Sequence, residues 1–374
     1  MNPGSQKPKT RLIAGTMTGT SIDGLDAALI EVTGHGLNIE ISVRECLSRS
    51  LGTLTYNLRR LAEQQPMTAQ EICQLNYRFS KFHSDCLSEL IGGYKIDLIA
   101  LHGQTIFHSP PLSWQLINPS LIAHSLNVPV VYDLRAADLF HGGQGAPITP
   151  LADFILFRDI NENRSIINLG GFCNITTIPA ILNTPDNKVD PEFWQTLVSG
   201  TDLCPCNHLL DNISRNLIGQ QYDEDGINAL SGNISERPFD DLMRIFKDML
   251  KEGRSLGTGD ETGEWISRYS GEVVAVDLAR TACAAIAQMI VDYCDSDRII
   301  LAGGGFKNAA LVEEIKFRFS GDVSYSDQFD ISHNHREAIE MAILGALCQD
   351  RIPITLPQVT GSKSEFISGC WVLP

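Results

Sequence analysis

The chain has 374 residues, of which 43% are hydrophobic and 20% are charged, and its formal net charge is −16 with a pI near 4.9. This length exceeds one ordinary core, so we expect two domains of roughly 150–200 residues each. The acidic balance excludes nucleic acid and an anionic membrane as partners, because both attract clustered Lys and Arg. The first residues lack the apolar core of a signal peptide, and no apolar run of about 18 residues occurs, so we expect a cytoplasmic protein.

The first half of the chain predicts a sheet that opens with a hairpin and continues with a parallel crossover. Short apolar segments at 11–15, 25–32 and 37–43 are typical of strands joined by turns. Thr68 begins a capping box (TAQE) ahead of a helix, and 95–101 is a short buried strand. A second helix starts behind Asn118 with Pro119 in its first turn, and 129–134 follows as a strand. Strand, helix and strand in this order make a parallel connection.

The second half opens like the first, which suggests an internal duplication. Residues 165–178 (SIINLGGFCNITTI) predict a strand, a glycine turn and a second strand. Helical patterns dominate up to Cys294, a strand at 298–302 runs into three glycines, and further helices are predicted at 307–319 and 336–350. The proline-punctuated tail predicts irregular structure.

Three glycine-rich loops follow predicted strands, at 17–24 (MTGTSIDG), 168–174 (NLGGFCN) and 301–308 (LAGGGFKN). Glycine lets successive N–H groups point at an anion, so phosphate is the expected ligand. Asp23 and Asp26 of the first loop could hold a hydrated Mg²⁺ near the phosphates. The alternative is a polar hairpin turn without a ligand. Walker and GxGxxG patterns are absent, which argues against P-loop and dinucleotide sites.

Further polar residues are candidates for catalysis and sugar binding. Phosphoryl transfer needs an oriented acceptor, so we expect a general base in a loop of the second domain. Asp202 in GTDLCPCNHLLD fits this expectation. Because it lies just ahead of a helix that starts near Asn207, a helix cap is the alternative. The sugar candidates lie at strand ends or on a mostly apolar helix, and they are His102, Gln104, Thr105, Arg135, Asp138 and Glu337.

Ten cysteines are scattered without paired spacing, which predicts free thiols in a reducing compartment. Cys204, Cys206 and His208 could supply three ligands to a soft metal, as the less favoured alternative to buried thiols.

Taken in order, these segments resemble the anhydro-N-acetylmuramic acid kinases along nearly the whole chain. The similarity is carried by GTMTGTSIDGLDAALIEV, LHGQTIFH, VVYDLRAADLFHGGQGAPITP, INLGGFCNIT, DLCPCNHLLD, YDEDG, LAGGGFKN and REAIEMAILG. The resemblance implies an α/β, two-domain, actin-like ATPase (ribonuclease H-like) fold with an inter-domain cleft. Residues 1–146 with 350–374 would carry the first phosphate loop and part of the sugar pocket. Residues 147–349 would carry the second phosphate loop, the catalytic aspartate and the adenosine loop.

The resemblance also implies the reaction, in which ATP and Mg²⁺ are used to hydrolyse the 1,6-anhydro bond of anhydro-N-acetylmuramic acid and phosphorylate O6 during cell-wall recycling. Asp202 would activate water, Asp23 would be the metal ligand, His102, Gln104, Thr105, Arg135, Asp138 and Glu337 would line the sugar pocket, and the protein would be a homodimer. The nucleotide would be held by Gly19, Thr20, Ser21, Ile22, Asp23, Gly24, Leu25, Asp26, Gly170, Gly171, Asn174, Gly303, Gly304 and Gly305.

Two alternatives follow from departures from the family pattern. Ala136 and Ala137 replace two family arginines, so the substrate could be a different 1,6-anhydro sugar. Cys204 and Cys206 replace two family glycines, so the chain could be a catalytically decayed member that binds a ligand or a protein.

Overall fold

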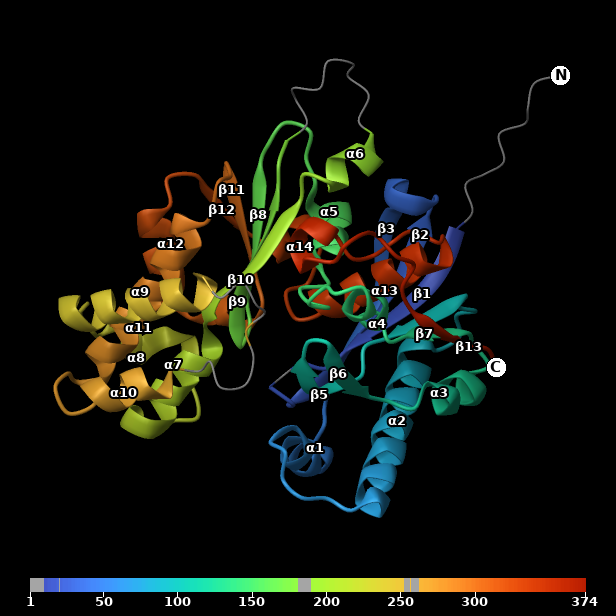
Figure 1. Ribbon diagram of the computed structural model, residues 1–374, viewed down its shortest axis with the longest axis horizontal. Helices are drawn as coiled ribbons and strands as arrows, with labels where there is room; N and C mark the ends of the chain where they lie inside the picture. The colour runs from blue at the N-terminus through green and yellow to red at the C-terminus, as the bar shows by residue number, and fades with distance from the viewer. Residues whose placement is uncertain (1–9, 20, 181–189, 252–255, 257–261) are drawn as a thin grey trace. The chain divides into compact units, whose positions relative to one another are not determined.

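The computed structural model (Figure 1) describes residues 10–374 except 20, 181–189, 252–255 and 257–261. The chain forms two compact units. The first is Met1–Leu156 with Val189–Thr196 and Asp330–Pro374, and the second is Phe157–Lys188 with Leu197–Phe329. The predicted domains, 1–146 with 350–374 and 147–349, differ from these units at 147–156, 189–196 and 330–349, which all belong to the first unit. The last of these segments carries a helix that packs on the first sheet.

The first unit is built around a sheet with the strand order β13-β7-β4-β1-β2-β3. β1, β2 and β3 form an antiparallel meander, β4 is parallel to β1, and β7 is parallel to β4. The predicted opening hairpin and parallel crossover are confirmed. The strands of this unit, including a separate β5–β6 hairpin, are β1 (Thr10–Met17), β2 (Gly24–Thr33), β3 (Glu40–Ser50), β4 (Leu98–Leu101), β5 (Gln104–Ser109), β6 (Leu112–Leu116), β7 (Val130–Tyr132) and β13 (Cys370–Val372).

Helices cover both faces of the first sheet. Successive side chains of a strand point to opposite faces, so β1 contacts a different helix on each face. Ala14 packs with Leu87 and Leu90 of α2 (Ala69–Ile91). Gly15 faces α13 (Arg336–Gln349), where a Cβ would collide with the Ala338 carbonyl oxygen. The close approach of β1 and α13 therefore requires glycine at position 15.

The predicted helix starts of this unit are confirmed by their caps. The Glu71 N–H donates to Thr68 Oγ1 at 3.2 Å and the Thr68 N–H donates to the Glu71 carboxylate at 2.7 Å, which completes the capping box. Asn118 caps α3 through the Leu121 N–H at 3.2 Å. The other helices of the unit are α1 (Leu54–Ala62), α3 (Pro119–Leu126), α4 (Ala136–Phe140), α5 (Pro150–Phe157), α6 (Pro191–Gln195) and α14 (Pro357–Thr360).

The second unit repeats the strand order in the sheet β10-β9-β8-β11-β12. β8, β9 and β10 form an antiparallel meander, β11 is parallel to β8, and β12 is parallel to β11. The shared order supports the suggested duplication, and the predicted α/β class with two ribonuclease H-like domains is confirmed. The strands are β8 (Arg164–Leu169), β9 (Phe172–Ile178), β10 (Ser199–Pro205), β11 (Arg298–Ala302) and β12 (Asp322–Tyr325).

An alanine-rich helix, α11 (Ala275–Asp292), lies in the core of the second unit and contacts α7, α8, α9 and α12. Its small side chains let several neighbours pack closely around it. The other helices of this unit are α7 (Asn207–Ile213), α8 (Ile227–Leu230), α9 (Glu236–Lys251), α10 (Gly263–Tyr269) and α12 (Ala309–Arg318).

Two local expectations were wrong. Asp202 was expected in a loop but lies on β10, which pairs with β9 although its sequence, SGTDLCP, has no clear strand alternation. The tail was expected to be irregular, but β13 pairs with β7 and adds an edge strand to the first sheet. Both strands depend on a partner that local sequence does not reveal. In the described part of the chain, no helix meets the length and apolarity needed to cross a membrane.

Candidate active site

The loop between β1 and β2 is a tight turn in the first unit. The Ile22 N–H donates to the Gly19 carbonyl oxygen at 3.2 Å, and Ile22 has a φ of 54°, which is uncommon for a β-branched residue. Ser21 Oγ donates to Asp23 Oδ1 at 2.7 Å. The strain at Ile22 marks this turn as a functional candidate. Of the other predicted loop residues, Gly24 and Leu25 begin β2, and Thr20 lies outside the described residues.

Three carboxylates gather beside this loop. Asp26 on β2 lies directly opposite Ser48 on β3, and Ser48 Oγ donates to Asp26 Oδ1 at 2.5 Å. Burial raises the pKa of Asp26 to about 6; the Ser48 hydrogen bond opposes this shift, and the charges of Glu337 and Asp23 add to it. Neighbouring negative charges of this kind favour a cation or a hydrogen-bond donor from a ligand.

The strand-end segment that contains Gln104 meets the first loop. Gln104 Nε2 donates to the Gly19 carbonyl oxygen at 3.2 Å. Gln104 Oε1 and Thr18 Oγ1 are buried and have no hydrogen-bond partner among the described residues. Buried polar atoms are rarely left unpaired. The two atoms therefore fit a site that a bound ligand or ordered water completes. Thr105, the next residue, is half-buried on β5.

His102 and Arg135 contact each other. Arg135 Nε and Nη2 lie 3.2 and 3.1 Å from His102 Nε2. Burial and the Arg135 charge lower the pKa of His102 to about 3, so the imidazole is neutral. Arg135 Nη1 donates to the Gly145 carbonyl oxygen at 2.5 Å, and the Gly145 N–H donates to Asp138 Oδ2 at 2.7 Å. Arg135 and Asp138 thus hold the backbone of Gly145, and His102 contacts Arg135. The contact of these three residues with sugar stays a prediction.

Glu337 lies in the first turn of α13, next to a buried ion-pair triad. Arg336 Nη1 donates to Asp153 Oδ1 at 2.5 Å and to Glu340 Oε1 at 2.6 Å. Burial alone would lower the pKa of Arg336, but Glu340 and Asp153 more than offset it and raise that pKa. Burial raises the pKa of Glu340 well above its ordinary value, against the effect of Arg336. The triad joins α13 to α5 and so holds the first turn of α13, in which Glu337 lies, in place.

In the second unit, Asp202 on β10 lies directly opposite Asn174 on β9, and the strand register shifts just after it. Irregular register of this kind re-aims side chains and is frequent next to active sites. Asp202 Oδ2 accepts a hydrogen bond from the Leu256 N–H at 2.9 Å. The Asn207 N–H donates to the Gly170 carbonyl oxygen at 3.0 Å, which joins the β8–β9 turn to the start of α7.

The triple-glycine loop presses against the end of β8. Gly303 has φ 78° and ψ 165°, and a Cβ there would lie 2.6 Å from Asn168 Oδ1. A Cβ on Gly305 would lie 2.8 Å from Asn207 Oδ1, whereas Gly304 has nothing within 4 Å. The structure therefore brings together three predicted segments of the second unit: 170–171, 202–207 and 303–305.

The cysteines beside Asp202 are core side chains. Cys204 and Cys206 are fully buried, and burial raises the pKa of the Cys206 thiol. No residue of 202–207 has a positive φ, the backbone region that favours glycine. His208 instead packs edge-on against Phe172, with ring centroids 5.0 Å apart. Among the described residues no group of three His, Cys, Asp or Glu is arranged to hold a metal, so the soft-metal alternative has no support.

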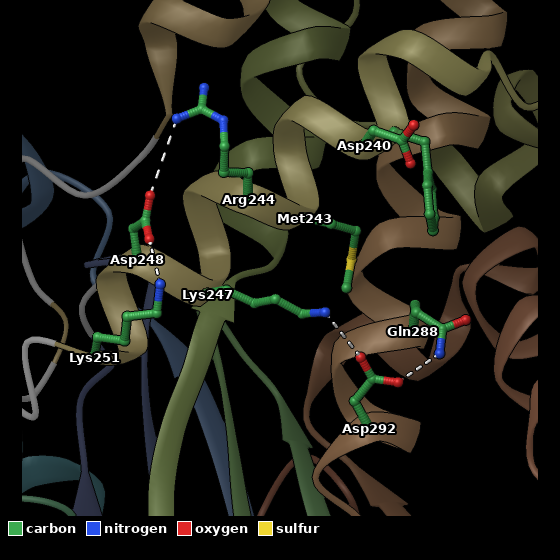
Figure 2. Close-up of a pocket in the computed structure, with 9 residues that line it drawn as sticks. Asp240, Met243, Arg244, Lys247, Asp248, Lys251, Gln288 and Asp292 are labelled. Atoms are coloured by element: carbon green, nitrogen blue, oxygen red, sulfur yellow. Dashed lines mark hydrogen bonds and ion pairs between the residues drawn. The ribbon is translucent and has the colours of Figure 1, made fainter.

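A hollow of about 520 Å³ between α9 and α11 does not contain the predicted site residues. Figure 2 shows its lysines turned toward acidic neighbours: Lys247 Nζ lies 3.6 Å from Asp292 Oδ2, and Lys251 Nζ lies 2.8 Å from Asp248 Oδ1. Its cations and carboxylates neutralise one another, so this surface has no excess charge with which to attract a nucleotide.

Ser48 and His335 were not predicted as site residues. Ser48 Oγ lies 3.0 Å from His335 Nε2, and Ser48 also contacts Asp26. A single serine on a strand and a histidine before a helix carry no local motif. Only strand register and the packing of α13 bring them together.

Comparison with known proteins places the chain in a family. A family model described as anhydro-N-acetylmuramic acid kinase matches residues 11–373. A relative of that name from Clostridioides difficile is 30% identical over 95% of this chain and 96% of its own, and one from Picosynechococcus sp. is 31% identical over 96% and 98%. Among solved structures, (R)-2-hydroxyglutaryl-CoA dehydratase component A of Acidaminococcus fermentans is similar with a TM-score of 0.43 and 12% identity over 90% of this chain and 98% of that chain, which is too distant to bear on the site.

Two α/β units with glycine loops at their strand ends fit a sugar phosphotransferase. The chain belongs to the anhydro-N-acetylmuramic acid kinase family, whose members are phosphotransferases with an alcohol group as acceptor. The predicted family and enzyme class are confirmed.

Proposed function

We propose that the protein uses ATP to convert anhydro-N-acetylmuramic acid and water into N-acetylmuramic acid 6-phosphate and ADP. The observation that carries this proposal is the family match, which runs over residues 11–373 without leaving out either unit. The strand-end loops of both units support it, because they offer backbone N–H groups and hydroxyls suited to phosphate.

Asp202 is the proposed general base. A carboxylate oxygen of Asp202 takes a proton from water, the water oxygen bonds to the anomeric carbon, and the bond from that carbon to O6 breaks. O6 then takes the γ-phosphoryl group of ATP, which leaves ADP. The hydrogen bond from the Leu256 N–H to Asp202 Oδ2 supports this role, since it orients the carboxylate that would take the proton.

The other predicted site residues are proposed to bind the nucleotide or the sugar. The segment 19–26, which covers the β1–β2 turn and the start of β2, would bind the phosphates together with Gly170, Gly171 and Asn174. The glycine loop 303–305 would bind the adenosine side. The neutral His102 supports a role as hydrogen-bonding partner of sugar hydroxyls, beside Gln104 and Thr105.

Mg²⁺ is proposed near Asp23. Asp23 is exposed, is held by Ser21 and lies close enough to Asp26 to raise its pKa, which fits one carboxylate contact beside nucleotide phosphates. When bound, the metal would neutralise phosphate charge. We also propose a cytoplasmic homodimer; a monomer mass in sedimentation would contradict the dimer.

The test is ADP release from Mg-ATP with anhydro-N-acetylmuramic acid, with a neutral 1,6-anhydrohexose, and without sugar. We expect turnover only with the first sugar. Asp202→Asn should lower kcat at least about 100-fold while ATP affinity stays unchanged. The matched control is Asp248→Asn, an exposed aspartate of α9. Full activity of Asp202→Asn would contradict the assignment. Faster ADP release with the neutral sugar would indicate a different substrate. No ADP release with any sugar, together with measurable ATP binding, would indicate a decayed enzyme.

A further inference from the structure

Four side chains of the first unit form a hydrogen-bonded chain that ends on Asp26. Ser332 Oγ lies 3.0 Å from His335 Nδ1, and His335 Nε2 lies 3.0 Å from Ser48 Oγ. Ser48 Oγ in turn lies 2.5 Å from Asp26 Oδ1. The chain crosses from the segment before α13 to β3 and then to β2.

The donors of this chain all point toward the carboxylate. An ionised carboxylate only accepts hydrogen bonds, so Ser48 must donate its single hydrogen to Asp26. Ser48 Oγ then accepts from His335 Nε2, which makes His335 the Nε2–H tautomer. Its bare Nδ1 therefore accepts from Ser332 Oγ. Burial and the nearby His333 lower the pKa of His335, which supports the neutral ring this assignment requires.

Both ring nitrogens of His335 are hydrogen-bonded, whereas one of the two carboxylate oxygens of Asp26 has no hydrogen bond within this series. His335 is the N-cap residue of α13, two residues before Glu337, so the ring moves with the helix start. Among the described residues the Asp26 carboxylate accepts one hydrogen bond, the one from Ser48, and that bond uses Oδ1. Asp26 Oδ2 is left for a hydrogen-bond donor of the substrate complex.

We propose that His335 is a positioning residue, which acts through Ser48 to hold the Asp26 carboxylate in one orientation beside Glu337. This rests on the proposed function, in which Asp26, on β2 just after the glycine-rich loop, belongs to the phosphate-binding segment 19–26. His335 itself touches neither substrate, and its contribution is to keep Ser48 from donating its hydrogen elsewhere.

The test is a double-mutant cycle of Ser48→Ala and His335→Ala in the full chain, with kcat and KM for ATP measured beside the melting temperature. Each single change should lower kcat/KM about tenfold, because a hydrogen bond to a charged group is disturbed. The double variant should lose no more kcat/KM than either single variant, because both substitutions break the same series of hydrogen bonds. His335→Gln, whose amide can donate to Ser48, should retain activity within about twofold. The matched control is His124→Ala, an exposed histidine of α3.

Unchanged activity of His335→Ala, losses that multiply in the double variant, or equal losses in the Gln and Ala variants would each overturn the proposal. A melting temperature that falls in step with activity would also overturn it, since that indicates a merely structural role. If the wild-type protein releases no sugar-dependent ADP, the proposed function fails instead. The positioning role of His335 is then tested by the affinity for ATP, measured by calorimetry. His335→Ala must bind ATP more weakly than the wild type and His335→Gln do.

Discussion

Replacing Gly303 by alanine should destabilise the second unit. At φ 78° and ψ 165°, Gly303 occupies a backbone region that is essentially restricted to glycine, and a side chain there costs about 1–3 kcal/mol. The new Cβ would also lie 2.6 Å from Asn168 Oδ1 and 2.9 Å from the Leu169 carbonyl group, and overpacking of this kind costs about 1–3 kcal/mol. The sum is about 2–6 kcal/mol, since the two effects have separate causes.

Gly304→Ala is the matched control, because a Cβ at the neighbouring position meets nothing within 4 Å and needs no positive φ. Thermal unfolding with and without ATP is the assay. A domain of this size loses about 2–4 °C of melting temperature for each kcal/mol, so Gly303→Ala should melt at least about 4 °C lower, while Gly304→Ala stays near the wild type. Equal melting temperatures for Gly303→Ala and the wild type would refute the argument from backbone conformation and contact.

Two further changes concern buried charges in the first unit. His83 is fully buried with its pKa lowered by burial to about 4, so the folded state keeps it neutral while the unfolded state takes up a proton as the pH falls below about 6.5. Up to about 3 kcal/mol of stability should be lost between pH 6.5 and 4. His83→Phe should make the free energy of unfolding in urea less dependent on pH in this range. The same pH dependence in the variant and the wild type would contradict a buried neutral His83. Arg336→Met should cost about 3–5 kcal/mol, because it leaves Asp153 and Glu340 buried without their cation. Adding Asp153→Asn and Glu340→Gln should recover most of that loss in chemical unfolding, and no recovery would show that packing, not charge, dominates.

The family was readable from the order of its segments, and the phosphate-loop candidates could be named because glycines and hydroxyls follow apolar strands. The roles of individual residues were harder to anticipate. Arg135 and Asp138 were predicted as sugar ligands from their position after a strand, and the structure adds that both hydrogen-bond to the backbone of Gly145. Ser48 and His335 showed no motif at all, because their connection depends on the alignment of two strands and one helix.

Local sequence by itself determined where helices such as α2 and α3 begin, since caps such as Thr68 and Asn118 act within a few residues. It also determined the repeated strand–turn–strand opening of the two halves. Tertiary structure alone decided that Asp202 lies on a strand, that α13 packs on the first sheet, and that Asp26 faces Ser48. The physical reason is that strand register and helix packing depend on contacts between segments far apart in the chain, where burial and hydrogen bonding select one arrangement among several that local propensity allows.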